Sequence, residues 1–205
     1  MGDDAVLLVI DVQVDFLPGG ALAVPRGDEV VPVINRLAAR FGNVVLTQDW
    51  HPPGHVSFAS RHPGRRPFET IDLPYGSQVL WPDHCVQGSA GAAFAAALDV
   101  RHAQAVIRKG YHAHTDSYSA FVEADRATPT GLAGLLRERG IRRVVCCGLA
   151  TDFCVAWSAL DAQAAGFETW VVEDACRAID TGGSLAAALA QLAAAGVRTL
   201  TADRL

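Results

Sequence analysis

The stretch VVCCGLATDFCVAW, Val144 to Trp157, joins a run of small and β-branched apolar residues to a segment with helical periodicity. The apolar run, from 142 to 148, predicts a buried strand, and the segment from 151 to 166 predicts a helix. A short turn containing Gly148 separates them. A strand followed closely by a helix is the repeating unit of α/β proteins, so this stretch indicates the fold class.

The same alternation continues in both directions along the chain. Five further apolar runs predict strands: AVLLVID (5–11), NVVLTQD (43–49), AQAVIRKG (103–110), ETWVVED (168–174) and VRTLTAD (197–203). Helical periodicity marks DEVVPVINRLAARFG (28–42), TGLAGLLRERG (130–140) and SLAAALAQLAAAG (184–196). Right-handed crossovers between such strands predict a Rossmann-like, three-layer α/β/α fold with a central, mainly parallel six-stranded sheet.

The length of 205 residues, half of them apolar, favours a single domain over 1–205. The stretch from Gln48 to Gly91 departs from the strand and helix pattern, because it is rich in Pro, Gly, His and Asp. Long loops in compact domains are usually functional or disordered, so we expect functional residues in this one.

Charge and cysteine content limit the partners and the compartment. The net charge is -5 and there is no run of Lys or Arg, so we expect a small-molecule substrate and no nucleic acid. The start MGDDAVLLVID is not typical of a signal peptide, and no apolar stretch is long enough to predict a membrane span. Five cysteines, an odd number, favour reduced thiols in the cytoplasm. Monomer and homo-oligomer stay open as alternatives.

Polar residues that directly follow the predicted strands are candidates for a site, because ligands of open parallel sheets bind at the carboxyl ends of the strands. Asp11 ends the first strand and Lys109 the third, and Cys154 follows the fourth. If the first and fourth strands are neighbours, Asp11 and Cys154 face each other, and Lys109 beside Asp11 would hold the carboxylate ionised. Taken singly, Asp11 is as well explained as a loop aspartate and Lys109 as an edge residue.

The three cysteines of the opening stretch differ in their surroundings. Cys146 and Cys147 lie within the apolar strand, where a thiol packs as a small hydrophobic group. Cys154 lies near the start of the helix, with Thr151 or Asp152 as the expected cap, where free backbone N–H groups favour a thiolate. Cys154 is therefore the candidate nucleophile.

Histidines after the second strand predict a metal site. TQDWHPPGH supplies Asp49, His51 and His55, and WPDHC supplies His84. One carboxylate with imidazoles and no thiolate cage suits Zn, Fe or Mn in a site with open positions. A second pair, His112 and His114, has no accompanying carboxylate at comparable spacing, so we expect it at the surface.

Taken together, these residues show that the chain resembles the nicotinamidase family of the isochorismatase-like hydrolase superfamily. The matching stretches cover nearly the whole chain in order: DVQVDFLPGGALAV (11–24), TQDWHPPGHVSFAS (47–60), LWPDHCVQGSAG (80–91), RKGYHAHTDSYSAF (108–121) and GLATDFCV (148–155). The combination is far more specific than any one of its parts.

The resemblance implies roles for the candidate residues. It makes Cys154 the nucleophile, Asp11 the general acid and base, and Lys109 the third member of a triad. It implies a cis peptide between Leu149 and Ala150, with the N–H groups of Ala150 and Cys154 as the oxyanion hole. Phe153 replaces a Tyr or His that is common in the family.

The remaining implied roles concern the metal and the substrate ring. The resemblance makes Asp49, His51 and His84 the ligands of one divalent ion, with Zn ahead of Fe and Mn. For His55 it leaves direct ligation and a contact through water as alternatives. Phe16, Trp81 and Tyr118 would wall the ring pocket. The metal would hold the ring nitrogen.

The implied reaction is the hydrolysis of nicotinamide to nicotinate and ammonia through a cysteine thioester, with pyrazinamide as a second substrate. Two alternatives stay open. Another amidase or carbamoyl hydrolase of the superfamily would share Asp11, Lys109 and Cys154 without needing the metal residues. A noncatalytic, metal-stabilised binding module would explain the metal residues alone.

Overall fold

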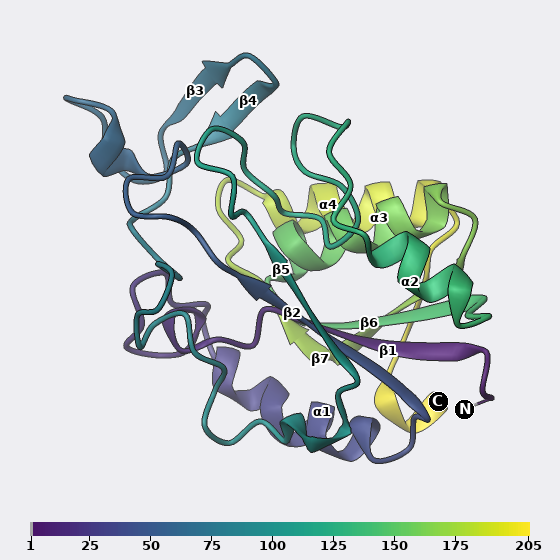
Figure 1. The fold of residues 1–205 in the computed structure, drawn as a ribbon. Helices are drawn as coiled ribbons and strands as arrows, with labels where there is room; N and C mark the ends of the chain where they lie inside the picture. Colours follow the sequence, from purple (N-terminus) through teal and green to yellow (C-terminus); the bar gives the residue numbers. More distant parts are fainter. Residues whose placement is uncertain (1) are drawn as a thin grey trace.

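The six runs predicted as strands form one sheet in the computed structural model, which describes residues 2–205 (Figure 1). Its order is β5-β2-β1-β6-β7-β8, and every neighbouring pair is parallel. The bounds are β1 (Ala5–Ile10), β2 (Asn43–Asp49), β5 (Ala105–Lys109), β6 (Arg143–Leu149), β7 (Glu168–Arg177) and β8 (Arg198–Leu200). The predicted parallel six-stranded sheet is confirmed.

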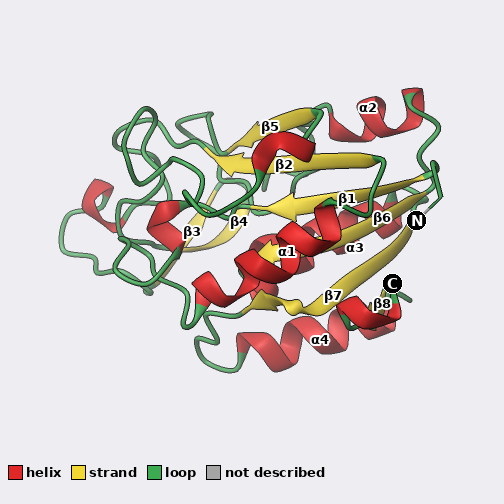
Figure 2. Ribbon diagram, turned by 90° about the horizontal axis from the view of Figure 1, so that it is seen from below, coloured by secondary structure: helices red, strands yellow, loops and turns green. Residues whose placement is uncertain are grey.

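Helices cover both faces of the sheet. They are α1 (Val30–Ala38), α2 (Leu132–Glu138), α3 (Ala156–Ala164) and α4 (Ser184–Ala194). Figure 1 shows α1 on one side of the sheet and the other three on the opposite side, and Figure 2 shows the layers from below. The three-layer α/β/α prediction is therefore confirmed. In the described part of the chain, no helix is both long enough and apolar enough to cross a bilayer.

Two neighbouring strands, β1 and β6, mark the point where the strand order reverses. The chain runs from β1 outward to β2 and β5, then returns to place β6 on the other side of β1. The backbones of β1 and β6 approach closely at Gly148, where a Cβ would lie 2.1 Å from the carbonyl oxygen of Ile10. The φ of Gly148, 118°, also favours glycine at this position. A crevice forms at such a reversal in open parallel sheets, so the residues after β1 and β6 lie at the expected site.

The stretch from Gln48 to Gly91 contains an antiparallel hairpin that the sequence analysis did not predict. Strands β3 (Thr70–Leu73) and β4 (Gly76–Val79) pair with each other and not with the central sheet. The hairpin projects from the body of the molecule in Figure 1. Short 3-10 turns complete the described chain, at Val14–Phe16, Gly27–Glu29, Ala59–Arg61, Val100–His102 and Ala202–Arg204.

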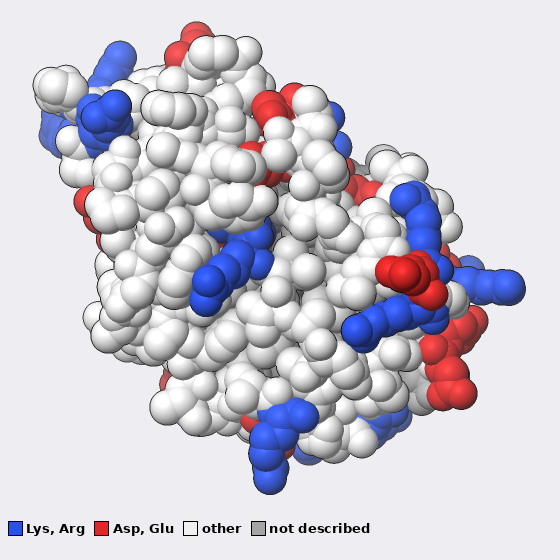
Figure 3. Space-filling view, viewed as in Figure 1, with Lys and Arg blue, Asp and Glu red and all other residues white. Residues whose placement is uncertain are grey.

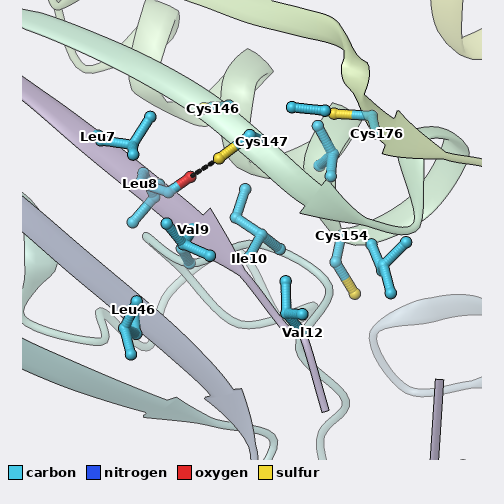
Figure 4. Packing of buried hydrophobic residues seen from close by; sticks show 14 of the residues in the cluster. Leu7, Leu8, Val9, Ile10, Val12, Leu46, Cys146, Cys147, Cys154 and Cys176 are labelled. Atoms are coloured by element: carbon cyan, nitrogen blue, oxygen red, sulfur yellow. Dashed lines mark hydrogen bonds between the residues drawn. The ribbon is translucent and has the colours of Figure 1, made fainter. Parts of the chain in front are cut away.

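The core lies around β1 and β6, where Cys146 and Cys147 are fully buried (Figure 4). The thiol of Cys147 donates only a long contact of 3.8 Å to the carbonyl of Leu8. Burial raises the pKa of both thiols, so they stay protonated and pack as apolar groups. All five cysteines of the chain are free.

Charged side chains are dispersed on the face of the molecule drawn in Figure 3. Lys and Arg stand there in separate small groups, and acidic side chains lie among several of them. A continuous basic stripe of the kind that binds a phosphate backbone is not present on that face. The expectation about nucleic acid stays a prediction.

Candidate active site

Asp11, Lys109 and Cys154 come together at the carboxyl edge of the sheet, from the ends of β1, β5 and β6. The ammonium Nζ of Lys109 lies 2.7 Å from Asp11 Oδ2 and 3.3 Å from Cys154 Sγ. It also donates to the carbonyl of Ser117 at 2.9 Å. Cys154 is only 6% exposed, and Asp11 and Lys109 are fully buried. The expected convergence of these three side chains is thus present in the structure.

The carboxylate of Asp11 is held in a defined orientation by Thr47. The hydroxyl of Thr47 donates to Asp11 Oδ1 at 2.6 Å and accepts from the Asp11 backbone N–H at 3.1 Å. Among residues 2–205, no donor makes a hydrogen bond of good geometry to Asp11 Oδ2, although Lys109 lies within ion-pair distance. A lone pair on Oδ2 thus remains to accept a proton. Asp11 also has a φ of 49°, a strained conformation of the kind found at functional sites.

Lys109 is shared between two carboxylates with different surroundings, because it also forms an ion pair with Asp49. Burial raises the pKa of Asp11 in spite of the ammonium. Burial acts in the same direction on Asp49, but Lys109 and His51 outweigh it and hold the pKa of Asp49 well below its usual value. Lys109 thus acts on Asp11 in the expected direction, toward the ionised form, although burial has the larger effect on its pKa; for Asp49 the ammonium and His51 prevail.

The turn that carries Cys154 differs from the predicted helix start. Thr151–Val155 form one π-helical turn before α3, and its N-cap is Ala150, with no side-chain cap bond. The prediction of Thr151 or Asp152 as cap was wrong, because Asp152 binds a different loop. Burial raises the pKa of the Cys154 thiol well above its usual value, although Lys109 acts in the opposite direction. The thiol thus needs a base to become a nucleophile.

The peptide between Leu149 and Ala150 is cis, as the resemblance implied.

Asp49, His51 and His84 form a cluster of potential metal ligands. Asp49 Oδ2 lies 3.5 Å from His51 Nε2 and 3.7 Å from His84 Nε2. The other ring nitrogens, both Nδ1, contact backbone carbonyls at 2.9 Å, those of Gly110 and Pro82. Such carbonyls fix the proton on Nδ1 and leave Nε2 free as a ligand. One carboxylate oxygen and two imidazole nitrogens then face one point, a donor set that suits a divalent transition metal with open positions.

His55 lies behind this cluster, with its ring 4.4 Å from that of His51. Its Nδ1 contacts the Ser57 hydroxyl at 2.8 Å, and its Nε2 contacts the carbonyls of His112 and Thr115 at 3.1 Å. Both ring nitrogens thus have protein partners. Direct ligation would require His55 to break one of these contacts, so the structure favours an indirect role.

A pocket of about 340 Å³, including its part open to solvent, connects the cysteine with the metal residues. Phe16, Trp81 and Tyr118, the three predicted wall residues, line it. The hydroxyl of Tyr118 accepts hydrogen bonds from Trp81 Nε1 at 3.0 Å and from Gln78 Nε2 at 3.1 Å. The other residues that line it are Leu22, Asp49, His51, His84, Asp116, Ala150, Phe153, Cys154 and Ile179.

Several residues of this site were not found from the sequence. Gln13 joins the ends of β1 and β2, since its side chain donates to the carbonyl of Asp49 and accepts from the Asp49 N–H, both at 2.8 Å. Asp116 lines the pocket and accepts from Gln78 Nε2 at 2.7 Å, so the β3–β4 hairpin contributes to the site. Both lie within stretches that carried the resemblance, but no local pattern distinguishes them. His112 and His114 are exposed, as expected, and His112 Nδ1 contacts Glu123 Oε1 at 2.9 Å.

These features define the class to which the protein belongs. Residues 5–204 match the family model described as the isochorismatase domain. The chain is a member of that family.

Several of its curated relatives within the family are nicotinamidases. The chain is 56% identical over 199 residues to a nicotinamidase of Acinetobacter baylyi, covering 97% of this chain and 93% of the relative. A solved nicotinamidase and pyrazinamidase structure from Acinetobacter baumannii superposes with a TM-score of 0.99 at 57% identity, covering all of both chains. The pyrazinamidase of Pyrococcus horikoshii, solved in complex with zinc, gives a TM-score of 0.78 at 36% identity, covering 97% of this chain and 99% of that one.

Proposed function

We propose that this chain hydrolyses nicotinamide to nicotinate and ammonia through a cysteine thioester, with the help of one bound divalent metal ion. The observation that carries the proposal is that a Cys, Asp and Lys cluster and a cluster of potential metal ligands adjoin one pocket. The nicotinamidase relatives support the same activity. The free cysteines are consistent with a cytoplasmic location.

The first half of the reaction forms the thioester. Asp11 accepts the proton of the Cys154 thiol, and the sulfur attacks the carboxamide carbon. A pKa raised by burial suits Asp11 for this exchange, because it makes the carboxylate a stronger base toward the thiol. The tetrahedral intermediate collapses as Asp11 returns the proton to the leaving nitrogen, and ammonia departs.

The second half regenerates the enzyme. Asp11 takes a proton from water, the hydroxyl oxygen attacks the thioester carbon, and the C–S bond breaks as Cys154 regains a proton. In both halves we assign the backbone N–H groups of Ala150 and Cys154 to the oxyanion hole. The support for this assignment is that both residues line the pocket, on the turn that begins α3.

We assign Asp49, His51 and His84 to the metal, which we propose to be zinc. The donor set supports this choice, as does the zinc complex of the Pyrococcus horikoshii relative. An ion bound by these residues would supply a Lewis acid for the pyridine nitrogen and would so help to orient the ring. His55 then buttresses His51 through their ring contact. Phe16, Trp81 and Tyr118 enclose the ring faces.

A comparison of four amides tests this proposal. On zinc-loaded protein we expect efficient release of ammonia from nicotinamide and pyrazinamide, which place a ring nitrogen in the same relation to the carboxamide. Benzamide lacks that nitrogen and picolinamide has it beside the amide-bearing carbon, so kcat/KM should fall, for benzamide by about ten-thousandfold. Equal turnover of benzamide would show that the ring nitrogen is not held by the metal, and absence of ammonia release from every amide would overturn the function.

A further inference from the structure

Asp152 lies on the turn Thr151–Val155, two residues before Cys154, and its carboxyl group binds a loop from another part of the chain. Asp152 is 5% exposed. Its Oδ1 accepts from the backbone N–H of Ile179 at 3.1 Å. Its Oδ2 accepts from the N–H of Asp180 at 2.8 Å and from the hydroxyl of Ser184 at 2.5 Å. Three donors thus converge on one buried carboxyl group and attach the turn to this loop.

The loop held in this way, residues 178–183, connects β7 to α4. It is the yellow-green segment that leads into α4 in Figure 1. Its backbone is unusual, because Asp180 has a φ of 53° and the next two glycines have φ values of 59° and 82°. A positive φ is costly for Asp180, so the conformation requires outside support. The bonds to Asp152 supply that support at the N–H groups of Ile179 and Asp180.

The loop matters for the pocket because Ile179 is part of its wall. Ile179 lines the same cavity as Cys154, Phe153 and Ala150. Its backbone N–H is held by Asp152, so the position of this wall residue depends on that carboxyl group. The turn that carries the nucleophile and the wall that limits the ring are therefore joined through one carboxylate.

We propose that Asp152 is a positioning residue for substrate selection, which holds Ile179 as a wall that excludes rings with added alkyl groups. The proposal rests on the proposed function, because it concerns amides bound in the same pocket. Asp152 does not touch the reacting atoms in this assignment. It acts through the loop, and Ser184 is its partner on α4.

The experiment compares nicotinamide with its 2-, 4-, 5- and 6-methyl derivatives on zinc-loaded protein. Ile179→Ala is measured first, since it identifies the isomer that the wall excludes. For that isomer we expect kcat/KM relative to nicotinamide to rise by about tenfold, the usual effect of one methyl group in an apolar pocket. Asp152→Asn and Ser184→Ala should also raise the kcat/KM of that isomer relative to nicotinamide. In addition, Asp152→Asn should raise KM for nicotinamide while kcat stays near the wild-type value.

A matched control is Asp174→Asn. Asp174 also accepts a backbone hydrogen bond, from the N–H of Ala202 at 2.8 Å, but it does not line the pocket. We expect Asp174→Asn to leave the kcat/KM values of the methyl derivatives, relative to nicotinamide, unchanged. Thermal unfolding and zinc content are measured for every variant, and Ser184→Ala, which keeps the carboxylate, tests the proposal even if Asp152→Asn fails to fold.

Three outcomes would overturn this inference. One is an unchanged isomer profile in Ile179→Ala, and another is an unchanged profile in Ser184→Ala together with Asp152→Asn. The third is a loss of kcat in Asp152→Asn with a shifted pH profile and unaltered selection, which would indicate an electrostatic effect on Cys154. Failure of the proposed function is distinguished from all three, because the wild-type protein would then release no ammonia from nicotinamide.

Discussion

Lys109 is the residue that joins the two clusters of the site, since its ammonium contacts Asp11, Asp49 and Cys154. Lys109→Met keeps the length of the side chain but leaves two buried carboxylates without their counter-charge. We expect ammonia release to be lost and the free energy of unfolding to fall by about 3–5 kcal/mol, as for one partner removed from a buried ion pair. Urea denaturation measures this change. A variant as stable as the wild type would show that Lys109 does not compensate these charges.

Cys154 and Cys147 provide a second test, because both are buried but only one opens into the pocket. Cys154→Ala should abolish ammonia release and keep the fold. Cys147→Ala should retain activity and cost about 1 kcal/mol of stability, as a small buried side chain does. Activity is followed by ammonia release and folding by circular dichroism. Substantial turnover by Cys154→Ala would exclude the covalent mechanism.

Single functional residues could be predicted from the sequence where they directly follow a strand. Asp11 and Lys109 could be found because parallel strands deliver their carboxyl ends to one edge. Asp152 was misassigned for a physical reason, since a short acidic side chain at a helix start normally caps its own helix. Here the N–H groups of Ile179 and Asp180 compete for it, and they are distant in sequence. Local rules do not reveal such a partner.

Among the elements, the end of β5 determines where His51 lies. Gly110 follows Lys109 with a φ of 64°, and a Cβ there would lie 2.4 Å from the His51 ring. Gly110→Ala should therefore displace His51 and reduce the zinc content of the purified protein, measured by elemental analysis.

A suitable control is Gly134→Ala, within α2. A Cβ at Gly134 meets nothing within 4 Å. This variant should bind zinc normally and gain roughly 0.5–1 kcal/mol in stability, because Ala is the better helix former. Normal zinc content in Gly110→Ala would contradict the packing argument.

The elements themselves were predictable to different degrees. The six sheet strands are apolar runs flanked by polar residues, so their burial is evident in the sequence, and even fully buried β1 was found. The hairpin of β3 and β4 was missed because its residues are mostly exposed or half-exposed and pair only with each other. Its one deeply buried side chain, Gln78, is polar and gives no apolar signal.

For the whole molecule, the proposed metal ligands are buried but lie beyond the apolar core, at the carboxyl edge of the sheet and in the long loop. Asp49 ends β2, whereas His51 and His84 lie in the long loop, so the three ligands that we propose would hold an ion without closing a structural site. Chelation should abolish ammonia release while far-UV circular dichroism stays nearly unchanged, and added zinc should restore activity. Unfolding on chelation would instead favour the metal-stabilised binding module.

The strand arrangement of the sheet could be partly predicted from the residues at the strand ends. The expected approach of Asp11 to Cys154 depended on the first and fourth predicted strands being neighbours. They are neighbours, because β1 pairs with β6 from Ala5 with Arg143 to Ile10 with Gly148. The pocket could not be predicted in the same way. Its walls come from segments as distant as Leu22, Trp81 and Ile179, whose meeting depends on loops without periodic patterns.

The pairing of β1 with β6 has a consequence for the order of events during translation. A nascent chain that ends before Arg143 already contains β1, β2 and β5, but the second edge of β1 has no neighbour. That edge belongs to six residues that are buried in the finished protein, and open apolar edges promote aggregation. Emergence of β6 from the ribosome closes the edge and in the same movement brings Cys154 beside Asp11. Pairing of β6 thus covers β1 and places the proposed nucleophile beside its proposed base, whereas the other edge of β6 is covered only later, by β7.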